Sequence, residues 1–179
     1  MEYQLSLWQT LAANFSADNM ALSIIVVVSQ LIVPLIMFMA LRNYPRIRSV
    51  ILAILIATTV GFSVFPIYGN GWKIVDKQLH MNAYGVSDTI NIEVMRIGIV
   101  KVGDQWDPIR RDMGAGLPNL LVGRCTMDNG KKALVFYYRN PDEMLLIEAK
   151  HKYYIIAYPG MESLYSELVR LGAKETLFG

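Results

Sequence analysis

Two long apolar runs dominate the N-terminal part of the chain. Residues 20–41 and residues 49–68 contain no charged side chain. At about 1.5 Å per residue, each run is long enough as a helix to cross a hydrocarbon core of about 30 Å. The pattern therefore predicts a two-helix transmembrane hairpin over residues 20–68. A cleaved signal peptide is not favoured, because it needs a positive N-terminal region and the first Lys or Arg of the chain is Arg42.

The flanks of the predicted hairpin indicate its orientation. The connector, residues 42–48, holds three arginines and no acid, whereas residues 1–19 hold two acids and no base. Because Lys and Arg next to membrane spans stay on the cytoplasmic side, the pattern predicts a two-span, multi-pass cell-membrane protein whose C-terminal part lies outside the cytoplasm. Residues 1–19 fit either a short interfacial helix or a frayed terminus, since their apolar residues recur at helical spacing. These residues are Leu5, Trp8, Leu11, Ala12 and Phe15.

A stripe of small residues marks one side of the second predicted span. Its members, each four positions apart, are Ser49, Ala53, Ala57 and Gly61. Small side chains let a second helix approach closely, so the stripe predicts a helix-packing seam. The first span of the same hairpin is the favoured partner, because the short connector places it alongside. A homo-oligomer is the alternative.

The chain after residue 68 has a different pattern, with charged residues and apolar runs of strand length. Asn129-Gly130 accepts the positive φ of a tight turn and predicts the strongest hairpin. Residues 69–72 are predicted to form a juxtamembrane joint with Trp72 at the headgroups, and residues 110–118 to be the longest irregular segment. Seven runs predict strands: residues 78–83, 86–91, 93–102, 121–127, 131–138, 144–149 and 153–158.

A single amphipathic helix is predicted to close this domain, over residues 159–171. Pro159 suits a first helical turn and Gly172 can cap the last one. A small, strongly bent antiparallel sheet leaves an open end, which the apolar face of such a helix can fill. That face consists of Met161, Leu164, Tyr165 and Leu168.

Three motifs in this domain carry a resemblance to a known family. They are Gly-Leu-Pro-Asn at 116–119, the hairpin Gly-Arg-Cys-Thr-Met-Asp-Asn-Gly-Lys-Lys-Ala at 123–133, and the strand-to-helix join Tyr-Tyr-Ile-Ile-Ala-Tyr-Pro at 153–159. With the two predicted spans before it, the stretch from about residue 75 to 172 resembles the bacterial membrane proteins with a pleckstrin-homology-like (PH-like) domain. The resemblance implies a binding or assembly role without catalysis.

The resemblance also implies a seven-stranded bent antiparallel barrel capped by one C-terminal helix. The expected fold class is therefore α+β, with a two-helix transmembrane hairpin before that barrel. A phosphoinositide site is not carried over, because eukaryotic domains of this shape cluster basic residues in the first hairpin. The corresponding stretch here has Lys77 and His80 but also Asp88. The expected domains are residues 1–19, 20–68 and 69–179.

Composition and charge narrow the chemistry further. The chain is 54% hydrophobic and 18% charged, against about 25% charged in an average protein. Its net charge of +2 gives no large basic field, so a nucleic-acid partner is not expected. One Cys and two His exclude an internal disulfide framework and would hardly fill a zinc site of the Cys/His type, so no metal site is expected. The sequence also carries no enzyme signature, and neither catalysis nor a cofactor is expected. Cys125, inside a predicted strand, is expected to be a buried, inert thiol.

Two basic clusters are the candidate contacts with a partner or lipid, and solvated surface charge is the alternative for both. Arg110 and Arg111 lie in the predicted irregular segment, and Lys150, His151 and Lys152 lie at a predicted turn. The expected function is that of a membrane-anchored, non-catalytic binding or assembly protein acting at the bilayer surface, with a protein or peptide partner. The alternatives are a subunit or regulatory module of a larger envelope complex, such as a transporter or sensor, and a bacteriocin self-immunity protein.

Overall fold

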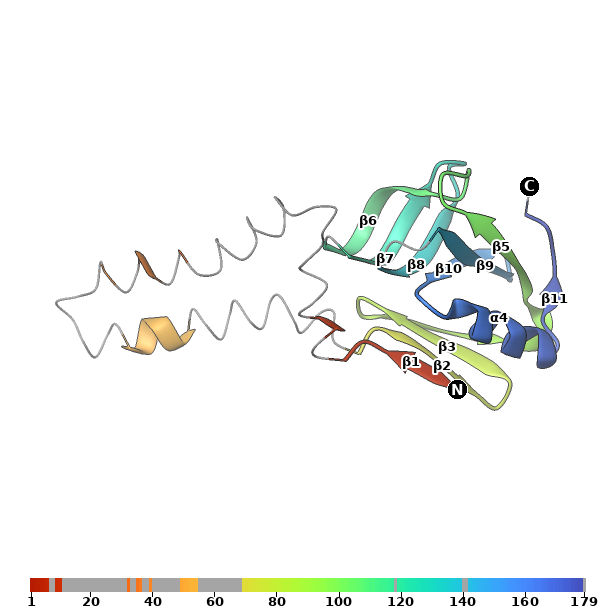
Figure 1. The fold of residues 1–179 in the computed structure, drawn as a ribbon, viewed down its shortest axis with the longest axis horizontal. Coiled ribbons are helices and arrows are strands. Elements are labelled where there is room, and N and C mark those ends of the chain that lie inside the picture. Colours follow the sequence, from red (N-terminus) through yellow and green to blue (C-terminus); the bar gives the residue numbers. More distant parts are fainter. Residues whose placement is uncertain are drawn as a thin grey trace.

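The structure, a computed structural model, describes residues 1–6, 9–10, 32, 35–36, 39, 49–54, 69–117, 119–139 and 142–178. In this part of the chain, most residues belong to two β-sheets, and a helix near the C-terminus lies beside them (Figure 1).

The smaller sheet, sheet A, joins the first residues of the chain to residues 71–91. It contains β1 (Glu2–Gln4), β2 (Gly71–Val75), β3 (Gln78–Ala83) and β4 (Val86–Asn91), antiparallel and in sequential order. Tight two-residue turns join β2 to β3 and β3 to β4. Asp76, Lys77, Tyr84 and Gly85, which form these turns, all have positive φ, as type I′ hairpin turns require.

The larger sheet, sheet B, has the strand order β11-β5-β9-β10-β8-β7-β6. Two of its pairs are parallel, β10 with β8 and β11 with β5, and the others are antiparallel. A short 3-10 helix, η1 (Ile92–Val94), leads into β5. The strands are β5 (Arg96–Lys101), β6 (Pro108–Leu117), β7 (Leu120–Met127), β8 (Lys132–Tyr138), β9 (Glu143–Ala149), β10 (Lys152–Ala157) and β11 (Lys174–Glu175).

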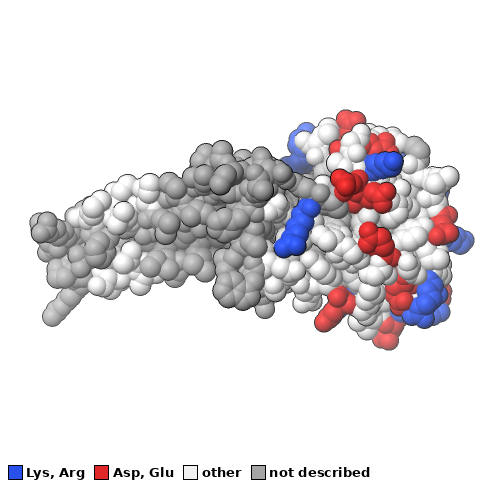
Figure 2. Space-filling view, viewed as in Figure 1, with Lys and Arg blue, Asp and Glu red and all other residues white. Residues whose placement is uncertain are grey.

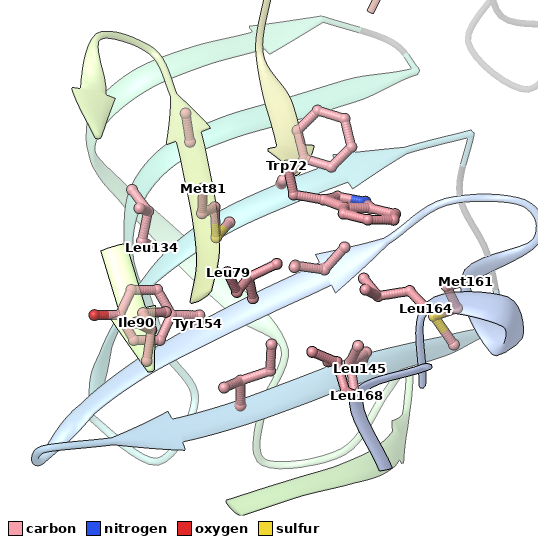
Figure 3. Packing of buried hydrophobic residues seen from close by; sticks show 14 of the residues in the cluster. Trp72, Leu79, Met81, Ile90, Leu134, Leu145, Tyr154, Met161, Leu164 and Leu168 are labelled. Carbon is pink, nitrogen blue, oxygen red and sulfur yellow. The ribbon is translucent and has the colours of Figure 1, made fainter. Parts of the chain in front are cut away.

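The main hydrophobic core lies between the two sheets and the C-terminal helix α4 (Met161–Arg170). Leu79 and Met81 of sheet A pack in one cluster with Leu145 of sheet B, and Leu164 and Leu168 of α4 close its side (Figure 3). All five side chains are fully buried. The predicted helix and its apolar face are therefore confirmed, and α4 fills the opening between the sheets.

The predicted transmembrane hairpin is corrected by the structure. No helix in the described residues is long and apolar enough to cross a membrane. The two predicted spans, residues 20–41 and 49–68, lie mostly outside the described residues. The fold class with a transmembrane hairpin, and the multi-pass cell-membrane localisation drawn from it, are thus wrong. Both predictions rested on the uncharged length of residues 20–41 and 49–68.

The described residues of these two runs are helical, and most of their side chains are exposed. Ser49 and Ala53 of the predicted small-residue stripe are exposed in the helical residues 49–54, whereas Ala57 and Gly61 lie outside the described residues. The helix-packing seam therefore stays a prediction. Large exposed hydrophobic side chains in these pieces are Ile32, Leu35, Ile36, Met39, Val50 and Ile54.

The N-terminal residues are part of the β-domain. Residues 2–4 form the edge strand β1, not the start of an interfacial helix. Leu5 is only 1% exposed, and the ring of Tyr3 stacks on Tyr158 with centroids 4.4 Å apart. Most of the remaining residues of the predicted helix lie outside the described residues. The domain boundaries at residues 19 and 68 stay predictions. The strand β1 pairs with β2 and so lies in the same sheet as the first strands of the C-terminal domain.

Two segments that were predicted to be irregular are strands. Trp72 lies in β2 and is 2% exposed, so its indole ring belongs to the core and not to a headgroup layer. The glycine-rich stretch lies in β6, where Gly114 pairs with Gly123 across the sheet. A Cβ on Gly114 would lie 2.0 Å from the carbonyl oxygen of Val122. These glycines therefore permit a close approach of two strands.

The seven-stranded barrel prediction is also corrected, although its individual strands are mostly present. The predicted bounds 78–83 and 86–91 are those of β3 and β4, and β7 to β10 lie within one or two residues of their predictions. However, β1, β2, β6 and β11 extend the fold into two sheets with two parallel pairs. Strands such as β11 are too short to give a local pattern.

Candidate functional site

The candidate site is a groove between the edge of sheet A and one end of sheet B. It has a volume of about 370 Å³ and opens between β4 and the strands β7, β8 and β10. We call it the basic groove. Its lining residues are Val86, Asp88, Arg124, Lys132, Ala133, Leu134, His151, Lys152, Tyr153 and Tyr154.

Three cationic side chains from three different strands meet at this groove. Lys132 and Lys152 are the first residues of β8 and β10. These two strands are parallel neighbours, so their starts lie at the same end of sheet B. Arg124 reaches the groove from β7, where it pairs with Leu134 of β8. His151, in the turn before β10, adds an imidazole ring to the rim.

Asp88 is the one acidic residue among those that line the basic groove. Its Oδ2 atom accepts hydrogen bonds from Lys152 Nζ and from the hydroxyl of Tyr154, both at 2.8 Å. Partial burial of Asp88 would raise its pKa, but the hydrogen bonds from Lys152 and Tyr154 outweigh this and hold the pKa below its ordinary value. Burial and the bond to Asp88 in turn raise the pKa of Tyr154. This carboxylate therefore stays ionised and links β4 to β10.

A second acidic residue, Asp112 of β6, lies next to the groove. Its carboxylate accepts a hydrogen bond from Thr126 at 2.9 Å and pairs with Arg110 Nε at 3.0 Å. Lys132 Nζ lies 3.9 Å from the same carboxylate. The hydrogen bond from Thr126, followed by that from Arg110, lowers the pKa of Asp112. Arg110 is thereby placed near the groove, with its charge largely balanced.

The five predicted contact residues are distributed unequally around the groove. His151 and Lys152 line it, and Arg110 is connected to it through Asp112. Lys150 is exposed in the turn after β9, and the Arg111 guanidinium lies beside Gly116. Neither lines the groove. Sequence reasoning missed Arg124 and Lys132, because a basic residue within a strand gives no signal until the neighbouring strands are known.

Cys125, His80 and Lys77 lie outside the basic groove. Cys125 is fully buried, and burial raises the pKa of its thiol to about 11, so it is a thiol and not a thiolate at neutral pH. His80 Nδ1 is hydrogen-bonded to the Thr89 hydroxyl at 2.9 Å, and Lys77 pairs with Glu93. No group of three or more metal-ligating side chains occurs in the described part of the chain.

Two other hollows are poorer candidates. One, of about 320 Å³ on sheet A, has a single lysine, Lys73, among its lining residues. The other, of about 260 Å³, lies at the far end of β7 and has Asp107 as its one charged lining residue. On the face shown in Figure 2, acidic and basic side chains are interspersed over the β-domain. Among these three hollows, the basic groove has the most Lys and Arg residues in its lining.

The fold consists of two sheets closed by a C-terminal helix, and the candidate site on it is the basic groove. A family model described as bacterial PH domain matches residues 72–171, more than half of the chain. The chain therefore belongs to the bacterial PH domain family, which confirms the PH-like part of the resemblance. No curated protein and no solved structure gives a significant match. PH-like domains are generally non-catalytic modules that bind proteins or lipids.

Proposed function

We propose that this chain is a non-catalytic binding module that holds a phosphate-bearing ligand in the basic groove. The observation that carries the proposal is the meeting of Arg124, Lys132 and Lys152 around a single lining carboxylate, Asp88. Lys and Arg are the residues that bind phosphate through charge-assisted hydrogen bonds. The volume of about 370 Å³ also falls in the range of small-ligand sites, about 300–1,000 Å³.

Arg124 is the central residue of this proposal. Lys152 is bonded to Asp88 at 2.8 Å and Lys132 lies 3.9 Å from Asp112. Among the described residues, Arg124 has no such carboxylate partner. Its guanidinium group is planar and presents paired N–H donors, which match two oxygens of one phosphate. Arg124 is therefore expected to make the strongest contact with the ligand.

The rest of the groove supports a ligand with one charged and one apolar part. Val86, Ala133 and Leu134 supply apolar surface between the cationic residues. Tyr154 is buried and donates its hydroxyl to Asp88, so it shapes the groove without offering a free donor. The phosphate group of the ligand would lie near Arg124, and the carbon portion of the ligand would lie on the apolar surface.

Calorimetric titration of the full chain with inositol hexakisphosphate, a soluble phosphate-rich probe, tests the proposal. Arg124→Gln should weaken binding about 10- to 100-fold, because a hydrogen bond to a charged group contributes about 1.5–3 kcal/mol. The matched control is Lys101→Gln, an exposed lysine on β5 that does not line the groove. Equal loss in both variants, or none in Arg124→Gln, would contradict the proposal.

The source of the phosphate is distinguished in a second arm of the experiment. Sedimentation with phosphatidylcholine vesicles containing about one fifth phosphatidylglycerol measures binding to a lipid surface. Binding to vesicles that is lost in Arg124→Gln would identify a lipid headgroup, whereas binding to the soluble probe alone would identify a free phosphate compound. The more specific roles, as a subunit or regulatory module of an envelope complex or as a bacteriocin self-immunity protein, stay predictions. The formation of a homo-oligomer also stays a prediction.

A further inference from the structure

The β5 edge of sheet B is covered by the last described residues of the chain. We call residues 174–178 the tail. Its first residues form β11, which runs parallel to β5. The amide of Lys174 donates to the carbonyl of Met95 at 2.9 Å, and the amide of Thr176 donates to the carbonyl of Ile97 at 2.8 Å. The tail therefore lies on this edge as an added strand.

Gly98 of β5 leaves room for the tail. A Cβ on Gly98 would lie 2.3 Å from the carbonyl oxygen of Thr176 and 2.9 Å from the ring of Phe178. Unlike many other glycines of this chain, Gly98 does not have a positive φ, so the backbone of β5 does not itself need glycine here. The missing side chain serves the close approach of a second strand.

Phe178 anchors the far end of the tail. Its ring meets Trp106 edge to face, with centroids 6.0 Å apart, and the Arg96 guanidinium lies 6.0 Å above it. Phe178 also packs against the second hydrophobic cluster of the domain. In contrast, Leu177 is 99% exposed. From Thr176 to Phe178 the side chains thus alternate between the domain and solvent, as they do in a strand that packs on one face.

The tail is held by few contacts in addition to these. The hydroxyl of Tyr165 donates to Glu175 at 2.7 Å, and Arg96 Nε lies 3.4 Å from the Thr176 hydroxyl. Both polar contacts are exposed to solvent. Gly172, with φ of +105°, joins the tail to α4. A segment with few buried contacts and exposed hydrogen bonds opens at low free-energy cost.

We propose that the β5 edge, with Gly98 and Trp106, is a strand-addition site for an extended protein segment of the pattern Thr-x-Phe, and that the tail is its resident occupant. Backbone hydrogen bonds to Met95 and Ile97 would provide affinity for any extended segment. Specificity would come from the space at Gly98 and from an aromatic ring packed on Trp106. Because the tail is tethered, it competes at a high effective concentration, and a partner segment must displace it.

Fluorescence anisotropy with a labelled peptide of residues 173–179 tests this proposal on the full chain. The peptide should bind the Phe178→Ala chain about 10-fold or more tightly than the unchanged chain, because the weakened tail competes less. Leu177→Ala is the matched control, since its side chain is exposed, and it should bind the peptide like the unchanged chain. Adding Gly98→Val to the Phe178→Ala chain should abolish binding, because the new side chain occupies the space of Thr176.

Equal peptide binding by the Phe178→Ala and unchanged chains, or binding that survives Gly98→Val, would overturn the proposal. Amide hydrogen exchange of the unchanged chain gives a measurement that needs no variant. Saturating peptide should speed exchange at Thr176 of the tail while the β5 amides stay protected, and unchanged exchange at Thr176 would also overturn the proposal. A concentration-dependent dimer of the unchanged chain, abolished by Gly98→Val, would identify a second copy as the source of the segment.

Discussion

The two ends of the described chain extend the two sheets, but they are held in different ways. At the N-terminus, β1 pairs with β2, the ring of Tyr3 stacks on Tyr158, and Leu5 is 1% exposed. At the C-terminus, β11 pairs with β5 over two residues, and Leu177 is 99% exposed. The pairing of β1 is antiparallel over three residues and that of β11 is parallel over two, and side-chain burial adds to this difference. We infer that β1 is part of the core and that the tail is a replaceable cover.

The largest expected effect is at the N-terminal end. Leu5→Ala should lower the free energy of unfolding by about 2–5 kcal/mol, because it removes a buried side chain and leaves a cavity. Urea denaturation measures this loss. A change below about 0.5 kcal/mol, the level of an ordinary surface substitution, would mean that β1 is as dispensable as the tail.

A pair of glycine substitutions compares the two ends directly. Gly71 accepts β1, and a Cβ there would lie 2.0 Å from the Tyr3 carbonyl oxygen, while its φ is +151°. Gly98 accepts the tail and has no positive φ. Gly71→Ala should therefore cost more stability than Gly98→Ala, by about 1–3 kcal/mol, because it adds backbone strain and displaces β1 together with the buried Leu5 that follows it. Thermal unfolding of the two variants checks the order, and the reverse order would contradict the comparison.

Removal of the aromatic anchor of the tail should have a smaller effect. Phe178→Ala is expected to lower stability by about 1 kcal/mol, in the range of an aromatic pair, since Phe178 is only partly buried. Leu177→Ala serves as the control and should change stability by less than about 0.5 kcal/mol. If Phe178→Ala proved as costly as Leu5→Ala in urea denaturation, the tail would belong to the core.

The smallest expected effect on stability is that of Asp88 in sheet A, whose carboxylate accepts hydrogen bonds from Lys152 and Tyr154 of sheet B. Because the pKa of Asp88 is lowered by folding, its contribution is present above the ordinary value of 3.8 and is lost as the pH falls through the lower folded value. Asp88→Asn should therefore be less stable than the unchanged chain at neutral pH, and the difference should shrink in acid. Unfolding measured from pH 7 down to about pH 2 tests this, and a difference independent of pH would contradict it.

Much of the local structure was predictable from the sequence. Alternating apolar residues and the Tyr84-Gly85 turn predict β3 and β4 with the bounds that the structure has. The apolar face of α4 also follows from helical spacing. In contrast, the candidate site was only partly predictable. Lys152 and His151 stand out at a turn, but Arg124 becomes a candidate only when β7, β8 and β10 are placed side by side.

The sequence by itself determined the strands and the helix whose periodicity is local, together with membership of the bacterial PH domain family. Only the tertiary structure decided that residues 2–4 complete sheet A, that residues 174–175 extend sheet B, and that β8 and β10 run parallel. The physical reason is that local conformation depends on neighbouring residues. Strand partners far apart in the chain are selected by how the sheets bury their apolar faces together.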